Sequence, residues 1–521
     1  MKKYHSIYVY QAFEPIVERV ECWLESLVSP LLGCDALTVK NRLTQRLVDL
    51  TLGPYTTLLS NRLRTGLSFL PPAEEEIDLA GIRIDPQSGR MRISLPALLR
   101  AIVDFGAHWL HNLWSIARIG TQRPRGKATL LFGVGAESVF IGGSDARFIE
   151  FCCQGPVAPL RQATRMIVQH AHLRGTESST SVSYARYPID RLACETRMSW
   201  SGRLILLFRH AMTPLHYAWA VLRCPALVLL SRDYAQSALF SALDLAGSIE
   251  AVVFTNSNYS MQPLWSRAPR SYETHMVWYS QNSIPLILKG DDFAADLPNY
   301  RHMYVDVHWV WTQGFRRHIL DQFGHMQRVE VVGPVIWYLP EPPTKRLNGF
   351  NIAAFDVTPT SDTYADSIGL LANYYNRVTA FGFLNGLLES AATLRETQGA
   401  NCTIQLKHKR HYSPIHDQGY IEMVSRLQGR GEINLIPFDI NMYSFILDCD
   451  VVVVIPNSSP SYIANSLGVP CIYFDPTMEL QPTFEPVPGV SFASGADALC
   501  EQLINIYRLK KSNNEQMSNG V

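Results

Sequence analysis

The residues best suited to chemistry lie in one segment near the end of the chain, 450–476, which reads DVVVVIPNSSPSYIANSLGVPCIYFDP. Its apolar run is typical of a buried strand, and a helical pattern begins directly after it. Small hydroxyl residues at such a junction can cap the helix and leave backbone N–H groups pointing outward. A phosphate placed there gains hydrogen bonds and the favourable end of the helix dipole. The pattern predicts phosphate ligands, with helix capping as the alternative, at Asn457, Ser458, Ser459 and Ser461.

A second polar group follows another strand-like run, where the sequence reads QLKHKRH at 405–411. Positive charge at the carboxyl end of a parallel strand faces the crevice in which ligands bind. We therefore expect Lys407, Lys409 and Arg410 to attract an anionic ligand, with a solvated loop as the alternative. Asp475 ends the run CIYFD and is expected beside the ribose of a nucleotide, with an Asp-Pro turn as its alternative role.

Several residues in the first half of the chain could accept a proton. Glu137 follows the apolar run ATLLF and the glycines of GVGAES, which let a substrate approach the backbone closely. It is the first candidate for a general base, provided that a closed site makes it basic enough. Asp145, Glu273 and His275 are further candidates, and a turn or capping role is the alternative for each.

Two series of alternating strand and helix patterns must position these residues. Strands of the first series are expected at 128–135, 225–231, 250–256, 274–280, 302–311 and 329–335. Strands of the second series are expected at 350–357, 402–409, 433–439, 450–456 and 470–476. The proline-rich segment 338–349 separates them.

Such alternation favours parallel, doubly wound sheets. We therefore expect an α/β protein with two Rossmann-like domains facing a cleft: a mainly helical region at 1–120 with a strand-like insert, an acceptor domain at 121–340 and a nucleotide-binding domain at 341–521.

The composition narrows the functional classes. Lys plus Arg and Asp plus Glu number 46 each, so no overall basic field favours nucleic acid, and we expect no nucleic-acid partner. The ten cysteines form no C-x-x-C pair and are expected to be buried thiols in a reducing cytoplasm. The most apolar stretch, 204–231, contains arginines and two prolines, so it does not fit a membrane span; a peripheral contact with a membrane surface stays open.

The segment PNSSPSYIANSLGVPCIYFDP resembles the PFTS-motif polysaccharide biosynthesis proteins, whose signature combines a Pro-x-Ser/Thr-Ser turn, Gly-x-Pro and Tyr-Tyr-Asp-Pro. Asn457 and Ser458 stand where that pattern has Phe and Thr. The resemblance extends to LKHKRHYS and, more weakly, to VVGPV, FNIAAFDVTP, LFGVGAESVF and HMVWYSQNS, and so covers roughly residues 128–480. The same motifs look like the paired-serine and basic elements of GT-B sialyl- and Kdo-transferases, which bind a CMP-sugar.

The resemblance implies a glycosyltransferase of the two-Rossmann-domain (GT-B) kind. Its partners would be a nucleotide sugar, with CMP favoured, and a surface polysaccharide or lipid-linked glycan such as O-antigen or capsule. The donor would be a substrate, with no cofactor and no metal, and the protein would be cytoplasmic, in peripheral contact with the inner membrane. Two alternatives stay open: a nucleotide-sugar 2-epimerase and a non-catalytic scaffold for glycan assembly.

Overall fold

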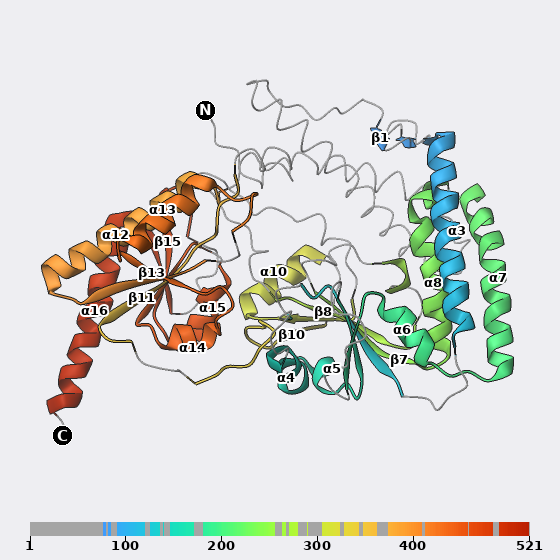
Figure 1. Cartoon of the computed structure of the whole chain (residues 1–521), viewed down its shortest axis with the longest axis horizontal. Helices are drawn as coiled ribbons and strands as arrows, with labels where there is room; N and C mark the ends of the chain where they lie inside the picture. The colour runs from blue at the N-terminus through green and yellow to red at the C-terminus, as the bar shows by residue number, and fades with distance from the viewer. Residues whose placement is uncertain are drawn as a thin grey trace.

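The computed structural model of the 521-residue chain describes residues 77–79, 82–84, 91–119, 126–135, 139, 146–170, 181–223, 225–255, 263–266, 270–279, 289, 305–323, 328–342, 347–361, 374–408, 412–456, 458–482 and 489–519. Two sheets with helices packed on them follow each other along the chain (Figure 1). A small antiparallel sheet precedes them, formed by β1 (Ile77–Leu79), β2 (Ile82–Ile84) and β3 (Met91–Ile93).

The first large sheet has seven parallel strands in the order β10-β9-β8-β7-β4-β5-β6. The chain builds outward from β4 in one direction, returns, and builds outward from β7 in the other. This is the doubly wound order of Rossmann folds, and β4 beside β7 is its switch point. The strands are β4 (Ala128–Phe132), β5 (Met166–Gln169), β6 (Val182–Ala185), β7 (Ile249–Thr255), β8 (Glu273–Val277), β9 (Val307–Val310) and β10 (Arg328–Val331).

The second large sheet repeats the scheme with six parallel strands in the order β13-β12-β11-β14-β15-β16. Its switch point lies between β11 and β14. The strands are β11 (Phe350–Phe355), β12 (Cys402–Lys407), β13 (Ile433–Ile436), β14 (Val451–Val454), β15 (Cys471–Asp475) and β16 (Val490–Ser494).

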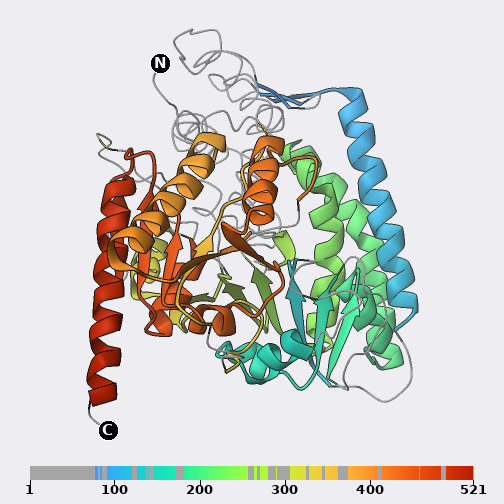
Figure 2. The same cartoon turned by 60° about the vertical axis from the view of Figure 1, so that its left-hand side comes forward.

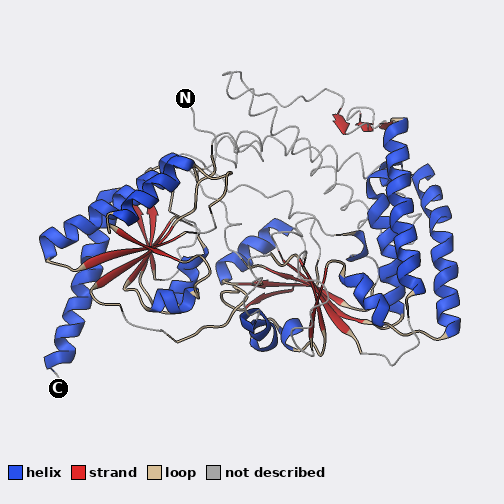
Figure 3. Ribbon diagram, viewed as in Figure 1, coloured by secondary structure: helices blue, strands red, loops and turns tan. Residues whose placement is uncertain are grey.

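Helices cover both sheets (Figure 3). Those of the first half are α3 (Leu95–Ala117), α4 (Ala146–Gln154), α5 (Ala158–Arg161), α6 (Pro188–Glu195), α7 (Trp200–Arg223), the 3₁₀ turns η2 (Pro225–Leu230) and η3 (Leu264–Ser266), α8 (Ser231–Leu245) and α10 (Gln313–Phe323). Those of the second half are α12 (Arg377–Gln398), α13 (Gln418–Gly429), α14 (Met442–Leu447), α15 (Ser459–Ser466) and α16 (Ala496–Asn519).

Local chemistry explains where helices of the second half begin. Asn376, Asp417 and Asn441 each precede a helix in extended backbone and accept hydrogen bonds from first-turn amides. These bonds satisfy donors that have no partner inside the helix. The α12 helix ends at Gly399, whose φ of 61° is the left-handed conformation that glycine adopts without strain.

The two faces of the second sheet have different neighbours. Residues of α12, α13 and α16 form one apolar core with one face. Residues of α14 and α15 share the other core with side chains of the first sheet, so this face looks toward the first half (Figure 2). Tyr443 Oη donates to Pro334 O at 3.4 Å, and the rings of Trp311 and Tyr462 meet edge to face at 6.1 Å between centroids.

The predicted architecture of two Rossmann-like domains is confirmed, and the expected linker 338–349 lies between β10 and β11. One predicted strand is wrong: residues 225–231 form η2 and the start of α8. A short apolar run fits a buried strand and a buried helical turn equally well. The prediction also lacked β5, β6 and β16.

The expected helical region 1–120 is described only in part, since residues 1–76 lie outside the described residues. Its predicted strand-like insert forms β2 and β3. The long helix α3 packs on the first large domain, where Asn112 Nδ2 donates to Ala235 O at 2.7 Å. By its packing, α3 is therefore part of the first large domain, although the predicted boundary assigned it to the preceding helical region.

Two further expectations concern cysteines and membranes. Of the described cysteines, Cys152, Cys402, Cys449 and Cys471 are buried, whereas Cys153 and Cys194 are exposed, which corrects the expectation of uniformly buried thiols. Within the described residues, no helix combines the length and the apolar character needed to cross a bilayer.

The packing of α12 on β15 gives a first prediction. A Cβ added at Gly386 would lie 2.6 Å from Cζ of Phe474, whose side chain is fully buried. We expect Gly386→Ala to lower the free energy of unfolding by about 1–3 kcal/mol. Gly429→Ala is the matched control, because a Cβ there meets nothing within 4 Å. Chemical denaturation of both variants measures the difference, and equal stabilities would contradict this packing.

Candidate functional site

The carboxyl ends of three neighbouring strands define the best candidate site. In the ladder, Phe355 of β11 pairs with Lys407 of β12 on one side and with Val454 of β14 on the other. The residues that follow these positions therefore emerge at one edge, at the switch point where doubly wound sheets bind ligands. Asp356 follows β11, and Ser458 lies four residues beyond the end of β14.

Lys407 is the most unusual ionisable group at this edge. It is the last residue of β12 and only 6% exposed. Burial lowers the pKa of its amine to about 8, while the carboxylates of Asp356 and Asp439 act in the opposite direction. The amine is therefore mostly charged at neutral pH, although it has lost most of its hydration. Such a cation is suited to an anionic ligand.

Asp356 is a site residue that the sequence analysis did not propose. It is 5% exposed and accepts a hydrogen bond from Tyr420 Oη at 2.8 Å. Burial, with the charge of Asp356 adding to it, raises the pKa of Tyr420 well above its ordinary value, so the phenol stays a donor. Asp356 could have been predicted from the sequence, because it is an acid that directly follows the apolar run FNIAAF, the first strand of the second domain.

Ser458 occupies the N-cap position of α15 in extended backbone, yet its side chain makes no capping hydrogen bond to an amide of that helix. Ser458 and Ser459 are both partly exposed. The capping role that was the alternative for Ser458 is therefore absent from this geometry. Its hydroxyl and the N-terminus of α15 remain suited to a phosphate group.

Ser461 and Asp475 both make hydrogen bonds within the second domain. The buried Ser461 Oγ donates to Ser458 O at 2.7 Å and lies 2.8 Å from Tyr473 Oη. Asp475 is fully buried and accepts hydrogen bonds from the hydroxyl of Tyr374, the amide and hydroxyl of Thr477 and the amide of Leu480. These bonds hold the turn after β15, which corresponds to the Asp-Pro turn that was the alternative to a ribose contact.

Glu273 lies at the amino end of β8 and His275 lies in the middle of that strand, so neither is at the carboxyl edge where the predicted role would place it. Glu273 begins β8, so it stands at the amino edge of the sheet, 3.3 Å from Arg328 Nη2. His275 is buried, and its Nδ1 accepts from Trp309 Nε1 at 3.3 Å. Burial lowers the pKa of His275 to about 4, so the ring is neutral at physiological pH. This pair fits a structural role better than proton transfer in a ligand crevice.

The remaining predicted residues lie outside the described residues: Glu137, Asp145, Lys409, Arg410 and Asn457. The start of the Glu137 loop is nevertheless described. Gly133 follows β4 with a φ of 81°, and its carbonyl accepts from Thr255 Oγ1 at the end of β7 at 2.5 Å. The loop that carries Glu137 therefore leaves the first sheet at its switch point.

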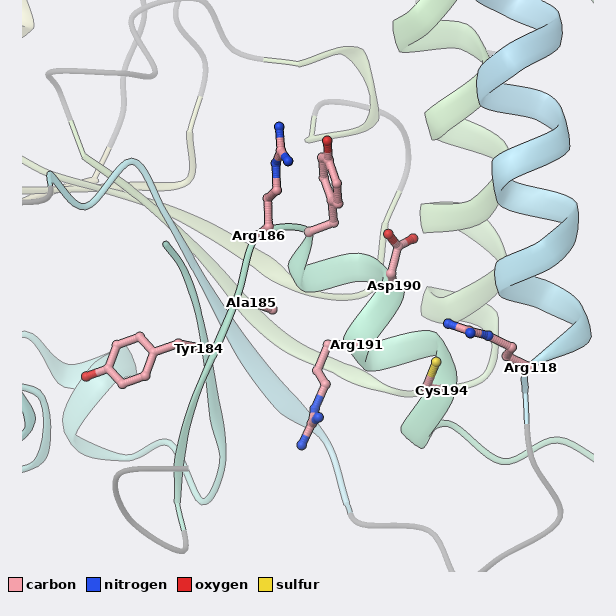
Figure 4. Close-up of a pocket in the computed structure, with 8 residues that line it drawn as sticks. Arg118, Tyr184, Ala185, Arg186, Asp190, Arg191 and Cys194 are labelled. Atoms are coloured by element: carbon pink, nitrogen blue, oxygen red, sulfur yellow. The ribbon is translucent and has the colours of Figure 1, made fainter. Parts of the chain in front are cut away.

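A pocket of about 430 Å³ lies elsewhere, beside the edge strand β6, and contains none of the predicted residues (Figure 4). Three arginines from different elements line it: Arg118 after α3, Arg186 after β6 and Arg191 in α6. Asp190 also lines it, and its carboxylate accepts from Ser115 Oγ at 2.9 Å and lies 2.8 Å from His111 Nε2. The pocket is basic, and it is separate from the edge that holds Lys407.

Several solved structures match parts of this chain at low sequence identity. A mutant of Staphylococcus aureus TarM, in complex with fondaparinux, α-GlcNAc-glycerol and UDP, is 11% identical with a TM-score of 0.31; the match covers 49% of this chain and 48% of that one. The chain thus spans about half the length of TarM. The wall teichoic acid polymerase TagF is 12% identical with a TM-score of 0.39, over 81% and 91% of the chains. Acinetobacter baumannii MurG is 9% identical with a TM-score of 0.33, over 74% and 91%.

Among curated proteins, no sequence relative is found. Comparison of the sequence with models of protein families does give a match. Residues 214–503 match the family described as polysaccharide biosynthesis PFTS motif protein. The match includes the second sheet, with Lys407 and the Ser458 turn, and it covers more than half of the chain. The chain therefore belongs to the polysaccharide biosynthesis PFTS motif family.

Proposed function

We propose that the protein is a glycosyltransferase that moves a sugar from a nucleotide donor onto a surface polysaccharide or a lipid-linked glycan, such as O-antigen or capsule. One observation carries the proposal. The buried amine of Lys407 lies at the same sheet edge as the uncapped Ser458 turn, in a chain of a polysaccharide biosynthesis family. Two strand spacings, about 10 Å, separate β12 from β14, which a phosphate with its attached sugar or nucleoside can bridge.

The lowered pKa of Lys407 supports a binding role because it shows that burial of the charged amine destabilises the folded protein. The amine titrates near pH 8 in the folded chain and near its ordinary value when unfolded. Its burial therefore costs on the order of 3 kcal/mol below pH 8, and this cost disappears as the pH rises from 8 towards 10.5. A bound phosphate offsets the cost by restoring a close negative charge.

The donor that we favour is a CMP-sugar, on the resemblance of the paired-serine and basic motifs to sialyl- and Kdo-transferases. In transfer, the acceptor hydroxyl oxygen forms a bond to the anomeric carbon, and the bond from that carbon to the phosphate oxygen breaks. The phosphate leaves with added negative charge, which Lys407 and the N-terminus of α15 stabilise. We propose Glu137 as the base that takes the acceptor proton, and we propose that no metal ion or cofactor is needed.

The acceptor side belongs to the first domain in this proposal, since the Glu137 loop leaves its switch point. An acceptor linked to a lipid places the protein in the cytoplasm, in peripheral contact with the inner membrane. Nucleic acid is not a partner in this scheme, because the chain has no net charge to attract it.

The activity itself is tested by incubating the purified full chain with CMP-, UDP- and GDP-sugars, with and without lipid-linked glycan. We expect nucleotide release that requires acceptor and persists in EDTA. Conversion of the sugar without acceptor would identify the 2-epimerase alternative. Absence of nucleotide release from every donor, with folded protein, would favour the scaffold alternative.

The titration of Lys407 predicts a pH dependence of nucleotide binding. A phosphate monoester is already almost fully charged above pH 7, so only the amine changes. We expect the Kd for the nucleotide to rise about tenfold from pH 7 to pH 9, as the amine loses its proton above pH 8. Calorimetry measures this change. Lys407→Arg should give a flat profile, and Lys407→Met should bind weakly throughout. A flat wild-type profile would remove Lys407 from the site.

We predict that replacing Ser458 weakens nucleotide binding but leaves the stability of the protein nearly unchanged. Because its side chain caps no amide of α15, Ser458→Ala should change the free energy of unfolding by less than about 0.5 kcal/mol. If the hydroxyl binds phosphate, nucleotide affinity should fall roughly 5- to 100-fold. Ser466→Ala, at the other end of the helix, is the matched control, since Ser466 Oγ donates to Ile463 O at 2.7 Å. Unchanged affinity in Ser458→Ala together with lost stability would assign the serine to folding alone.

A further inference from the structure

Two long helices of the first domain expose continuous apolar stripes. In α7, residues at helical spacing on one face are exposed by half or more of their surface: Trp200, Leu204, Phe208, Leu215, Trp219 and Leu222. In α3 the same is true of Leu95, Leu99, Ile102, Leu110 and Trp114. Monomeric soluble proteins rarely expose apolar patches of this extent, so the surface calls for a partner.

The two stripes form one surface. Arg203 near the start of α7 donates to Ala117 O at the end of α3, at 3.3 Å, so the helices run antiparallel. Midway, Trp109 Nε1 donates to His210 O and His210 Nε2 lies 2.9 Å from Trp109 O. Both helices pack on α8. Their exposed stripes therefore face away from it, at the outer side of the first domain (Figures 1 and 2).

Positive charges outnumber negative ones on these two helices. The 24 residues of α7 include three arginines and no acid, and Asp104 is the one acid of α3. At one end, Arg118 lies over the ring of Trp114 at 3.2 Å and Arg203 over the ring of Trp200 at 5.1 Å. Arg118 also lines the basic pocket beside β6, which continues the positive surface past the helix ends.

We propose that the α3–α7 face docks on a bilayer containing anionic phospholipids, with both helices lying in the plane of the membrane surface. Apolar side chains enter the acyl region, tryptophans lie at the boundary and arginines meet phosphate headgroups. A second copy is a poorer occupant, because it would bring arginines against arginines with few acids to pair them. This inference deepens the peripheral membrane location proposed above and gives that contact a surface.

Co-sedimentation with vesicles tests the docking without nucleotide or acceptor, so its outcome is independent of the transfer assay. The full chain is mixed with vesicles of phosphatidylethanolamine and phosphatidylglycerol at 7:3, or of phosphatidylcholine alone. We expect binding to the first and at least fivefold weaker binding to the second. Phe208→Glu with Leu215→Glu should weaken binding at least tenfold, because two charges would enter the acyl region.

Leu509→Glu is the matched control, since Leu509 is 66% exposed on α16 of the second domain and should leave binding unchanged. Arg118→Ala with Arg203→Ala should reduce the preference for anionic vesicles. Circular dichroism checks that each variant is folded. Absence of binding by the wild type, or an equal loss in Leu509→Glu, overturns the proposal. So does a wild-type dimer in light scattering that Phe208→Glu dissociates while vesicles bind neither form.

Discussion

The parallel pairing of β11 with both β12 and β14 is the constraint on which the candidate site depends. Parallel strands all end at the same edge, so residues separated by about fifty positions in sequence meet there without any local turn to join them. The crossover helices diverge at this point to opposite faces, which keeps the edge uncovered between them. Asp356, Lys407 and Ser458 owe their common location to this pairing alone.

The same pairing buries the charged amine of Lys407, which destabilises the folded protein. A strand buried on both faces must end somewhere, and a lysine as its last residue carries an ammonium group into surroundings that hydrate it poorly. Asp356 lies close enough to act on its pKa, while Tyr420 fixes that carboxylate by a hydrogen bond. Asp356 directly follows β11, Lys407 ends β12 and Tyr420 lies in α13, so a shift of any of these elements would disturb the electrostatics of the edge. Sites that bind charged ligands commonly contain such destabilising groups, and favourable interactions in the rest of the fold offset their free-energy cost.

The sequence predicted the second domain well because its strands are mostly continuous apolar runs with clear helix starts. The run PALVLL misled the analysis because a short apolar segment after a long helix fits a 3₁₀ turn as well as a strand. Lys407 and Ser458 were predicted from their position near a strand end, and the structure places both near the carboxyl edge of the second sheet. Periodicity does not reveal whether a polar side chain is already occupied, so Ser461 and Asp475 received ligand roles although their oxygens bind within the domain.

The reciprocal contact between Trp109 and His210 has a mechanical consequence. Their rings stack at 5.4 Å between centroids. Burial lowers the pKa of His210, while the hydrogen bond to the Trp109 carbonyl acts in the opposite direction. The contact joins the middle of α7 to the middle of α3 by two side-chain-to-backbone contacts. Ile116 of α3 belongs to the core of the first sheet, so the helix pair is packed directly on that sheet. If this side is anchored, the first domain becomes the stationary body, and any closing movement is a swing of the second domain above it.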